Sequence, residues 1–161
     1  MKLAGLALGL LLLGTAPAWA ESAEPVVAPV VFVGAGGTVA LDAAALEALP
    51  QVVQKITFKT SKGMSTGVYK GPLLWDVVQA AKGVDGLGHN EELARTLLVT
   101  AADGYKIAFS IGELSPEFGN AMILVALETD GQKLKNGFRI VVQGDKRGAR
   151  ALHNVTSIEV K

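Results

Sequence analysis

Residues 137–161 read GFRIVVQGDKRGARALHNVTSIEVK and contain two candidate strands around a basic loop. The candidate strands are apolar runs rich in β-branched residues, at 138–142 and 155–160, and turn residues bound each run. The loop, residues 144–150, holds three cations and two glycines. Arginine can bind a planar or anionic ligand through paired hydrogen bonds, and glycine lets backbone N–H groups approach such a ligand closely. The loop is therefore a candidate ligand site, and its alternative is an ordinary solvated connection between two strands.

The first twenty residues have the form of a secretory signal peptide. Lys2 precedes an apolar run at 3–13, and residues 18–20 (Ala-Trp-Ala) have the small-x-small form that signal peptidase cleaves. The run is too short to span a bilayer, and no later run approaches the roughly 20 apolar residues of a membrane helix. We therefore expect a signal peptide at 1–20, a mature N-terminus at Glu21, and a periplasmic or secreted protein.

Composition excludes several classes of function. Removal of Lys2 with the signal peptide leaves 14 basic and 15 acidic residues. This balance provides no overall field for nucleic acid or for an anionic membrane, so any cationic site must be local. The absence of Cys excludes thiolate catalysis and thiolate ligation of zinc, iron–sulfur clusters or molybdenum. The two histidines, His89 and His153, lack the spacing of a metal site, so we expect no metal.

The remaining patterns predict short strands with two or three small helices. Residues 21–29 read as a flexible leader, and residues 30–161 read as one domain. Strands are expected at 30–33, 51–58, 96–100, 105–110 and 121–128, and helices at 43–49, after the N-cap Asp42, and at 72–82. Shorter helical turns are expected within 85–95 and 111–118, and a polar loop at 59–67. This succession predicts a single α+β domain with a mainly β core and a few short helices.

Four signatures that occur in one order resemble a known family. They are YKGPLLWDVV at 69–78, ADGY at 102–105, SIGEL at 110–114, and FRIVVQGD at 138–145 followed by Arg147, Arg150 and the IEV of 158–160. Together they resemble the sulfite-oxidase-fold, or oxidoreductase molybdopterin-binding domain, family, and most closely its small exported single-domain members. The resemblance covers nearly all of residues 30–161 and implies a sulfite-oxidase-type molybdopterin-binding fold.

The chain departs from the enzymes of that family at the metal ligand. Catalytic members hold molybdenum through a Cys in the segment after the first long strand, and the corresponding residues here, 56–61, contain no Cys. Catalytic members are also larger, with additional residues that enclose the cofactor. Since loss of the thiolate removes a metal ligand, we do not expect the molybdenum cofactor, and the resemblance favours a binding protein over an enzyme.

The resemblance still implies a concave site for a free pterin, in either its oxidised or its reduced form. Small exported relatives are linked to pterin binding and to membrane proteins that control cyclic-di-GMP. We therefore expect a periplasmic, non-catalytic pterin-binding protein that acts as a ligand-dependent regulatory partner of a membrane signalling protein. A pterin needs an aromatic or apolar wall and a few fixed polar partners. The candidate ligand-binding residues are Trp75, Asp103, Tyr105, Asp145, Arg147, Arg150 and His153.

Several candidates, and the function itself, have alternatives. Trp75 can be a partly buried core residue, Asp103 can serve the turn before Gly104, and His153 can be an ordinary strand histidine. The protein can also be a molybdopterin-dependent oxidoreductase that holds its metal without Cys, which stoichiometric molybdenum in the purified protein would reveal. It can equally be a protein-interaction module without a small ligand, in which the basic loop docks a partner.

Overall fold

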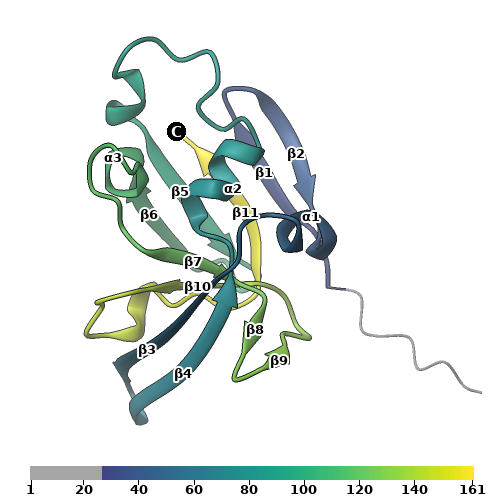
Figure 1. Cartoon of the computed structure of the whole chain (residues 1–161), viewed down its shortest axis with the longest axis vertical. Helices are drawn as coiled ribbons and strands as arrows, with labels where there is room; N and C mark the ends of the chain where they lie inside the picture. Colours follow the sequence, from purple (N-terminus) through teal and green to yellow (C-terminus); the bar gives the residue numbers. More distant parts are fainter. Residues whose placement is uncertain (1–26) are drawn as a thin grey trace, which may run out of the picture.

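The computed structural model describes residues 27–161, and it contains three sheets and a few short helices (Figure 1). The strands are β1 (Val30–Gly34), β2 (Gly37–Leu41), β3 (Val52–Thr60), β4 (Gly63–Gly71), β5 (Thr96–Ala101), β6 (Lys106–Ser110), β7 (Ile123–Ala126), β8 (Glu128–Thr129), β9 (Gln132–Lys133), β10 (Arg139–Val142) and β11 (Val155–Val160). The helices are α1 (Ala43–Glu47), α2 (Leu74–Ala80) and α3 (Ile111–Leu114), with 3-10 turns η1 (Glu91–Ala94) and η2 (Gly148–Arg150). This is the α+β class with a mainly β core that the sequence predicts.

The expected signal peptide at 1–20 and most of the expected leader lie outside the described residues. Val27, at the end of that leader, is partly buried against the core of the domain. Within residues 27–161, no helix is both long and apolar enough to cross a bilayer.

The five-stranded sheet has the order β2-β1-β11-β5-β6. β11 lies in its centre, parallel to β1 and antiparallel to β5, and the other neighbours are antiparallel. The two strands of segment 137–161 therefore belong to different sheets, because β10 pairs with β7 instead. The basic loop between them passes from one sheet to another.

The β7–β10 pair is buried on both faces, as its continuous apolar runs require. One face meets the main core, which also contains the inner face of the five-stranded sheet and α2; its residues are Ile123, Val125, Ile140 and Val142. The other face meets a smaller second core, whose members are Ile56, Phe58, Tyr69, Leu124, Ala126 and Val141. The β7–β10 pair is thus the shared wall of two hydrophobic cores.

The third sheet has the order β3-β4-β8-β9, and its long β3–β4 hairpin extends away from the five-stranded sheet (Figure 1). The polar loop expected at 59–67 is wrong, because β3 continues to Thr60 and β4 begins at Gly63. The inward positions of β4 before Tyr69 are Ser65 and Gly67, so this strand carries no alternating apolar pattern until its second half. A strand that buries so little apolar surface cannot be told from a polar loop by periodicity.

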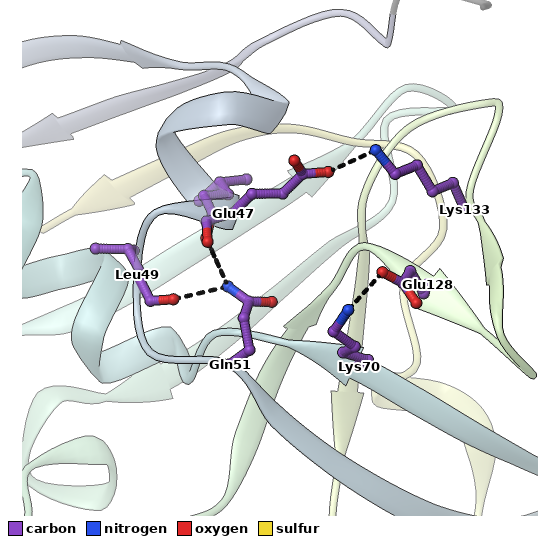
Figure 2. A network of polar contacts seen from close by, with 7 residues as sticks. Glu47, Leu49, Gln51, Lys70, Glu128 and Lys133 are labelled. Carbon is purple, nitrogen blue, oxygen red and sulfur yellow. Dashed lines mark hydrogen bonds and ion pairs between the residues drawn. The ribbon is translucent and has the colours of Figure 1, made fainter.

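Polar contacts fix the root of this hairpin (Figure 2). Gln51 Nε2 donates to the carbonyl oxygens of Leu46 and Leu49, both at 2.9 Å, which joins β3 to the end of α1. Two ion pairs lie in the same region, Lys70 with Glu128 at 2.8 Å and Lys133 with Glu47 at 3.0 Å. Gln51 therefore holds the root against the end of α1 and Lys70 holds it against β8, while Lys133 joins β9 to α1.

The two expected helices are confirmed with shorter bounds. Asp42 caps α1, since its Oδ1 accepts from Ala45 N at 2.8 Å. α2 begins two residues after Pro72 and buries Leu74, Val77 and Val78 in the main core. Its apolar residues recur at helical spacing, as predicted.

Candidate functional site

The basic loop leaves β10 and reaches β11 by way of η2, beside the tip of the β3–β4 hairpin. Gly144 has φ +87°, a backbone conformation that favours glycine, so the chain can turn sharply there. Lys59 N then donates to Lys146 O at 2.9 Å, which ties the loop to β3. The loop therefore lies against β3 and is not a free excursion into solvent.

Arg150 stabilises the same loop through hydrogen bonds from all three nitrogens of its guanidinium group. Nε and Nη2 donate to the two carboxylate oxygens of Asp145, at 2.9 and 2.6 Å, and Nη1 donates to Glu113 on α3 at 3.1 Å. The guanidinium carbon also lies 5.4 Å from the centroid of the Phe109 ring. The hydrogen bonds to Asp145, followed by the one to Glu113, raise the pKa of Arg150 above its already high ordinary value. Asp145 and Arg150 satisfy each other, and we assign them a positioning role.

Two hollows flank η2 and share Gly148 and Ala149 as a common wall. The first hollow has a volume of about 1000 Å³, and its other lining residues are Lys59, Thr60, Ser61 and Arg147. The second hollow has a volume of about 340 Å³ and lies between η2 and the β5–β6 turn; its polar and aromatic lining residues are Asp103, Tyr105, His153 and Asn154. The first hollow is cationic, and the second combines a carboxylate, a phenol ring and an imidazole.

In the second hollow, Asp103 and Tyr105 are arranged by the turn that carries them. Asp103 Oδ1 accepts from Tyr105 N at 2.9 Å, and Gly104 between them has φ +82°. The other carboxylate oxygen of Asp103 has no hydrogen-bond partner among residues 27–161. Tyr105 is 52% exposed, so a ligand in the hollow can reach it.

His153 also lines the second hollow. Its side chain is exposed, yet the protein around it removes enough water to lower its pKa, and the positive charge of Arg139 lowers the pKa further. The imidazole is therefore neutral at neutral pH and can both accept and donate a hydrogen bond.

Arg139 lies against two aromatic residues of the second core. Its guanidinium carbon lies 5.2 Å from the centroid of the Tyr69 ring and 5.7 Å from that of Phe58, and its Nε is buried without a partner in the described part of the chain. Burial lowers the pKa of Arg139. Gly148 packs on the same Phe58 ring so closely that an added Cβ would lie 2.7 Å from Cδ2. The floor under η2 is therefore aromatic and charged.

The structure brings together only some of the residues proposed from the sequence. Asp103, Tyr105 and His153 converge on the second hollow, and Arg147 lines the first. Trp75 lies on α2, partly buried against the main core, and it lines neither hollow. The position of Trp75 fits the alternative interpretation, in which Trp75 is a partly buried core residue and not a ligand-binding residue.

Two features of the site were not among the sequence candidates. Lys59, Thr60 and Ser61 line the first hollow, at the end of β3 and in the turn that follows it. Arg139 was also missed. The signal that could have found it is a charge at the head of an otherwise apolar strand, because a buried guanidinium is costly and rarely incidental.

Comparison with known proteins adds one finding. Neither a protein-family profile nor a curated protein sequence matches the chain. Among solved structures, the chain is similar to the sulfane dehydrogenase SoxCD from Paracoccus pantotrophus, with a TM-score of 0.64 and 15% sequence identity. The match covers 83% of this chain but only 38% of that one, so this chain spans little more than a third of its neighbour's length. At this identity the likeness speaks for the fold alone, and the fold of this chain is of the sulfite-oxidase type.

Proposed function

We propose that this protein binds a free pterin in the second hollow, without catalysis. The observation that carries the proposal is the convergence of Tyr105, Asp103 and His153 on one hollow of about 340 Å³. That volume lies within the range of small-molecule sites. A pterin is a flat bicyclic ring whose amino and N–H edge donates hydrogen bonds, so a ring to stack on and a carboxylate to accept are the partners it needs.

Each residue has a distinct role in this proposal. The exposed Tyr105 ring stacks on the pterin, and the free oxygen of Asp103 accepts from its donor edge. The neutral His153 imidazole, which also lines the hollow, donates to or accepts from the ring substituents of the pterin. Arg150 and Asp145 hold η2 in place as the opposite wall.

The residues around the hollows do not fit a molybdenum ion held by a protein thiolate. The chain contains no Cys, and the first hollow presents the side chains of Lys59, Thr60 and Ser61 instead. Hydroxyl and ammonium groups do not replace a thiolate as a ligand for this soft metal site. The proposal is therefore a pterin alone, and it includes no oxygen-atom transfer.

The location and partner in this proposal rest on the sequence. The signal-peptide pattern at 1–20 supports a periplasmic protein, and the resemblance to small exported pterin-binding relatives supports a regulatory partnership with a membrane protein that controls cyclic-di-GMP. Pterin occupancy of the second hollow would then alter the surface that the partner contacts.

A titration with tetrahydrobiopterin under anaerobic conditions, followed by calorimetry, tests the ligand site. Tyr105→Ala removes stacking worth roughly 1–3 kcal/mol, and Asp103→Asn removes a charge-assisted hydrogen bond worth roughly 1.5–3 kcal/mol. Each affinity should fall by about ten- to a hundredfold. Arg147→Ala is the matched control, because Arg147 lines the other hollow, and its affinity should stay within about twofold of wild type. Unchanged affinity in both Tyr105→Ala and Asp103→Asn would refute the proposal, and a loss in Arg147→Ala alone would move the ligand to the first hollow.

A further inference from the structure

β3 has a free edge before Lys59, because it is the outer strand of its sheet and its other edge pairs with β4; apart from β4, it forms one isolated bridge, between Lys59 and Arg147. The amide of Lys59 points away from β4, since it donates to Lys146 O. Alternate residues of a strand point their backbone groups in the same direction, so the N–H and C=O groups of Val53, Lys55 and Thr57 face the same edge. In the described chain, these groups have no partner. Such an edge can accept a further strand.

The cations beside this edge have no carboxylate partner among the described residues. Five exposed basic residues surround the outer face of β3, the hairpin tip and the start of the basic loop: Lys55, Lys59, Lys62, Lys146 and Arg147. None of the five forms an ion pair with a carboxylate of residues 27–161. By contrast, both lysines near the root of the same hairpin form ion pairs: Lys70 with Glu128 and Lys133 with Glu47 (Figure 2). In a chain with no net charge, this cluster is a local excess of positive potential.

Exposed apolar side chains alternate with the lysines on the outer face of the hairpin. Val53, which is 60% exposed, lies opposite Lys70, and Lys55 lies opposite Val68, which is 40% exposed. Met64, at 70% exposure, lies opposite Lys59. The face therefore offers apolar contact and positive charge in alternation, at the spacing of strand residues on one side of a sheet.

We propose that the β3 edge docks an extended acidic segment of a partner protein, which pairs with residues 53–57 as an added strand. Its backbone would supply the missing hydrogen bonds, and its carboxylates would face the five unpaired cations. The segment continues toward the first hollow, where Lys59 and Arg147 receive a further carboxylate. This docking does not depend on pterin binding.

The charge of the edge selects this occupant over a second copy of the chain. Two β3 strands paired edge to edge would place their own Lys55 and Lys59 side chains together, and like charges on neighbouring strands are destabilising. Edge lysines are a known means of preventing self-pairing. An acidic strand would form attractive contacts with the same lysines. The edge therefore disfavours pairing with a second β3 strand and favours pairing with an acidic segment.

The test uses a fluorescein-labelled decapeptide of alternating Glu and Val, followed by fluorescence anisotropy at constant ionic strength and without pterin. We expect the peptide to bind the wild-type protein and its Lys–Val counterpart not to bind. The Lys55→Glu, Lys59→Glu double variant should bind at least about tenfold more weakly. Lys106→Glu is the matched control, because Lys106 is an exposed lysine on β6, the edge strand of the other large sheet, and its affinity should stay within about twofold.

Backbone pairing is tested separately from charge. All Glu amides of the peptide face one edge and all Val amides face the other, so two N-methylated forms each block one edge. One of these forms should lose binding. Equal binding of both forms, an equal loss in the Lys106→Glu control, or displacement of the peptide by inorganic phosphate at matched ionic strength would overturn the proposal. Because pterin is absent throughout, failure here leaves the calorimetric test of the second hollow untouched.

Discussion

Arg150 joins three parts of the chain through one guanidinium: the basic loop, α3 and the Phe109 ring of β6. Because all three nitrogens of this guanidinium already donate to carboxylates, Arg150 stabilises the elements that it connects and has little capacity left to bind a ligand. The side chain is 35% exposed, so solvent screens part of this stabilisation.

Arg150→Ala should therefore lower the free energy of unfolding by about 1–2 kcal/mol, after allowance for that exposure. Arg147→Ala, the control from the same loop, should change it by less than about 0.5 kcal/mol, because Arg147 is exposed and forms no ion pair among the described residues. Denaturant titration followed by circular dichroism measures both. Equal effects of the two substitutions would show that the ion pairs of Arg150 contribute nothing beyond a surface cation.

His153 should make stability depend on pH in a specific direction. Burial, and then the charge of Arg139, lower its pKa in the folded state, while the unfolded chain keeps the ordinary value of about 6.5. The unfolded state therefore binds the proton first as the pH falls, so this contribution to stability is fully present above about pH 6.5 and is lost as the pH falls through the folded-state pKa. The other charged or titratable groups at the second hollow are Asp103 and Tyr105.

The measurement compares unfolding free energies of wild type and His153→Gln from pH 7.5 downward. The difference between the two proteins should grow as the pH decreases below about 6.5, to the disadvantage of wild type. Arg139→Met should raise the pKa of His153 in an NMR titration, since it removes the neighbouring positive charge. A difference that shrinks toward low pH would contradict the assignment.

At the scale of elements, η2 is seated on β3 by one close contact, between Gly148 and the ring of Phe58. A Cβ at position 148 would lie 2.7 Å from Cδ2 and 2.8 Å from Cε2 of that ring, and Phe58 is only 3% exposed and cannot swing into solvent. Gly148→Ala should therefore destabilise the protein by about 1–3 kcal/mol through overpacking. It should also displace the wall that both hollows share.

A double-mutant cycle separates this steric cause from a change in backbone flexibility. In a Phe58→Leu background the smaller side chain leaves room, so the cost of Gly148→Ala should fall by at least about 1 kcal/mol. Thermal unfolding of the four proteins in the cycle provides the coupling energy. If Gly148→Ala costs the same in both backgrounds, the contact with Phe58 does not determine the identity of residue 148.

The elements also show how far the sequence could predict this structure. The strand runs at 138–142 and 155–160 were predictable because they are apolar, β-branched and bounded by turns, and Asp103-Gly104 was a clear turn signal. The pairing of β10 with β7 was not predictable, because it depends on contacts distant in sequence. The end of β3 after Phe58 and the first half of β4 were missed, because the residues there are polar, glycine or exposed and bury almost no apolar surface.

Only part of the candidate site was predictable from the sequence. Asp103, Tyr105, Arg147 and His153 carry polar or aromatic groups on turns, and they were identified by residue type alone. Trp75 was included among the candidates because it is aromatic. Its position in the helical pattern, next to Leu74 and Val78, already allowed partial burial in the main core. The mutual pairing of Asp145 and Arg150 could not be foreseen, since both groups are equally suited to bind a ligand or each other.

At the scale of the whole molecule, the β7–β10 pair should make the two cores unfold together. Trp75 is the one tryptophan of residues 27–161, and it reports on the main core. Val141 is fully buried on the opposite face of the pair, in the second core. A cavity in the second core should therefore weaken the structure that surrounds Trp75 as well.

Val141→Ala should lower the free energy of unfolding by about 1.5–3 kcal/mol and shift the Trp75 fluorescence transition and the circular dichroism transition to the same midpoint. Val53→Ala removes the same atoms from an exposed position and should change stability by less than about 0.5 kcal/mol. Separate midpoints for the two probes in Val141→Ala would show that the cores are independent.

The central place of β11 has a consequence for how the protein is made. β1 and β5 both need β11 as their neighbour, and residues 155–160 are synthesised long after both of them. Until the ribosome has delivered those residues, each of the two earlier strands keeps an unpaired edge, and the five-stranded sheet cannot close. Contacts between residues so distant in sequence form slowly, because a long loop must lose conformational entropy before the contacts can stabilise the fold. Until residues 155–160 are synthesised, residues 27–154 therefore lack a closed five-stranded sheet, and an incompletely folded chain is the form in which a polypeptide can be threaded through a narrow pore.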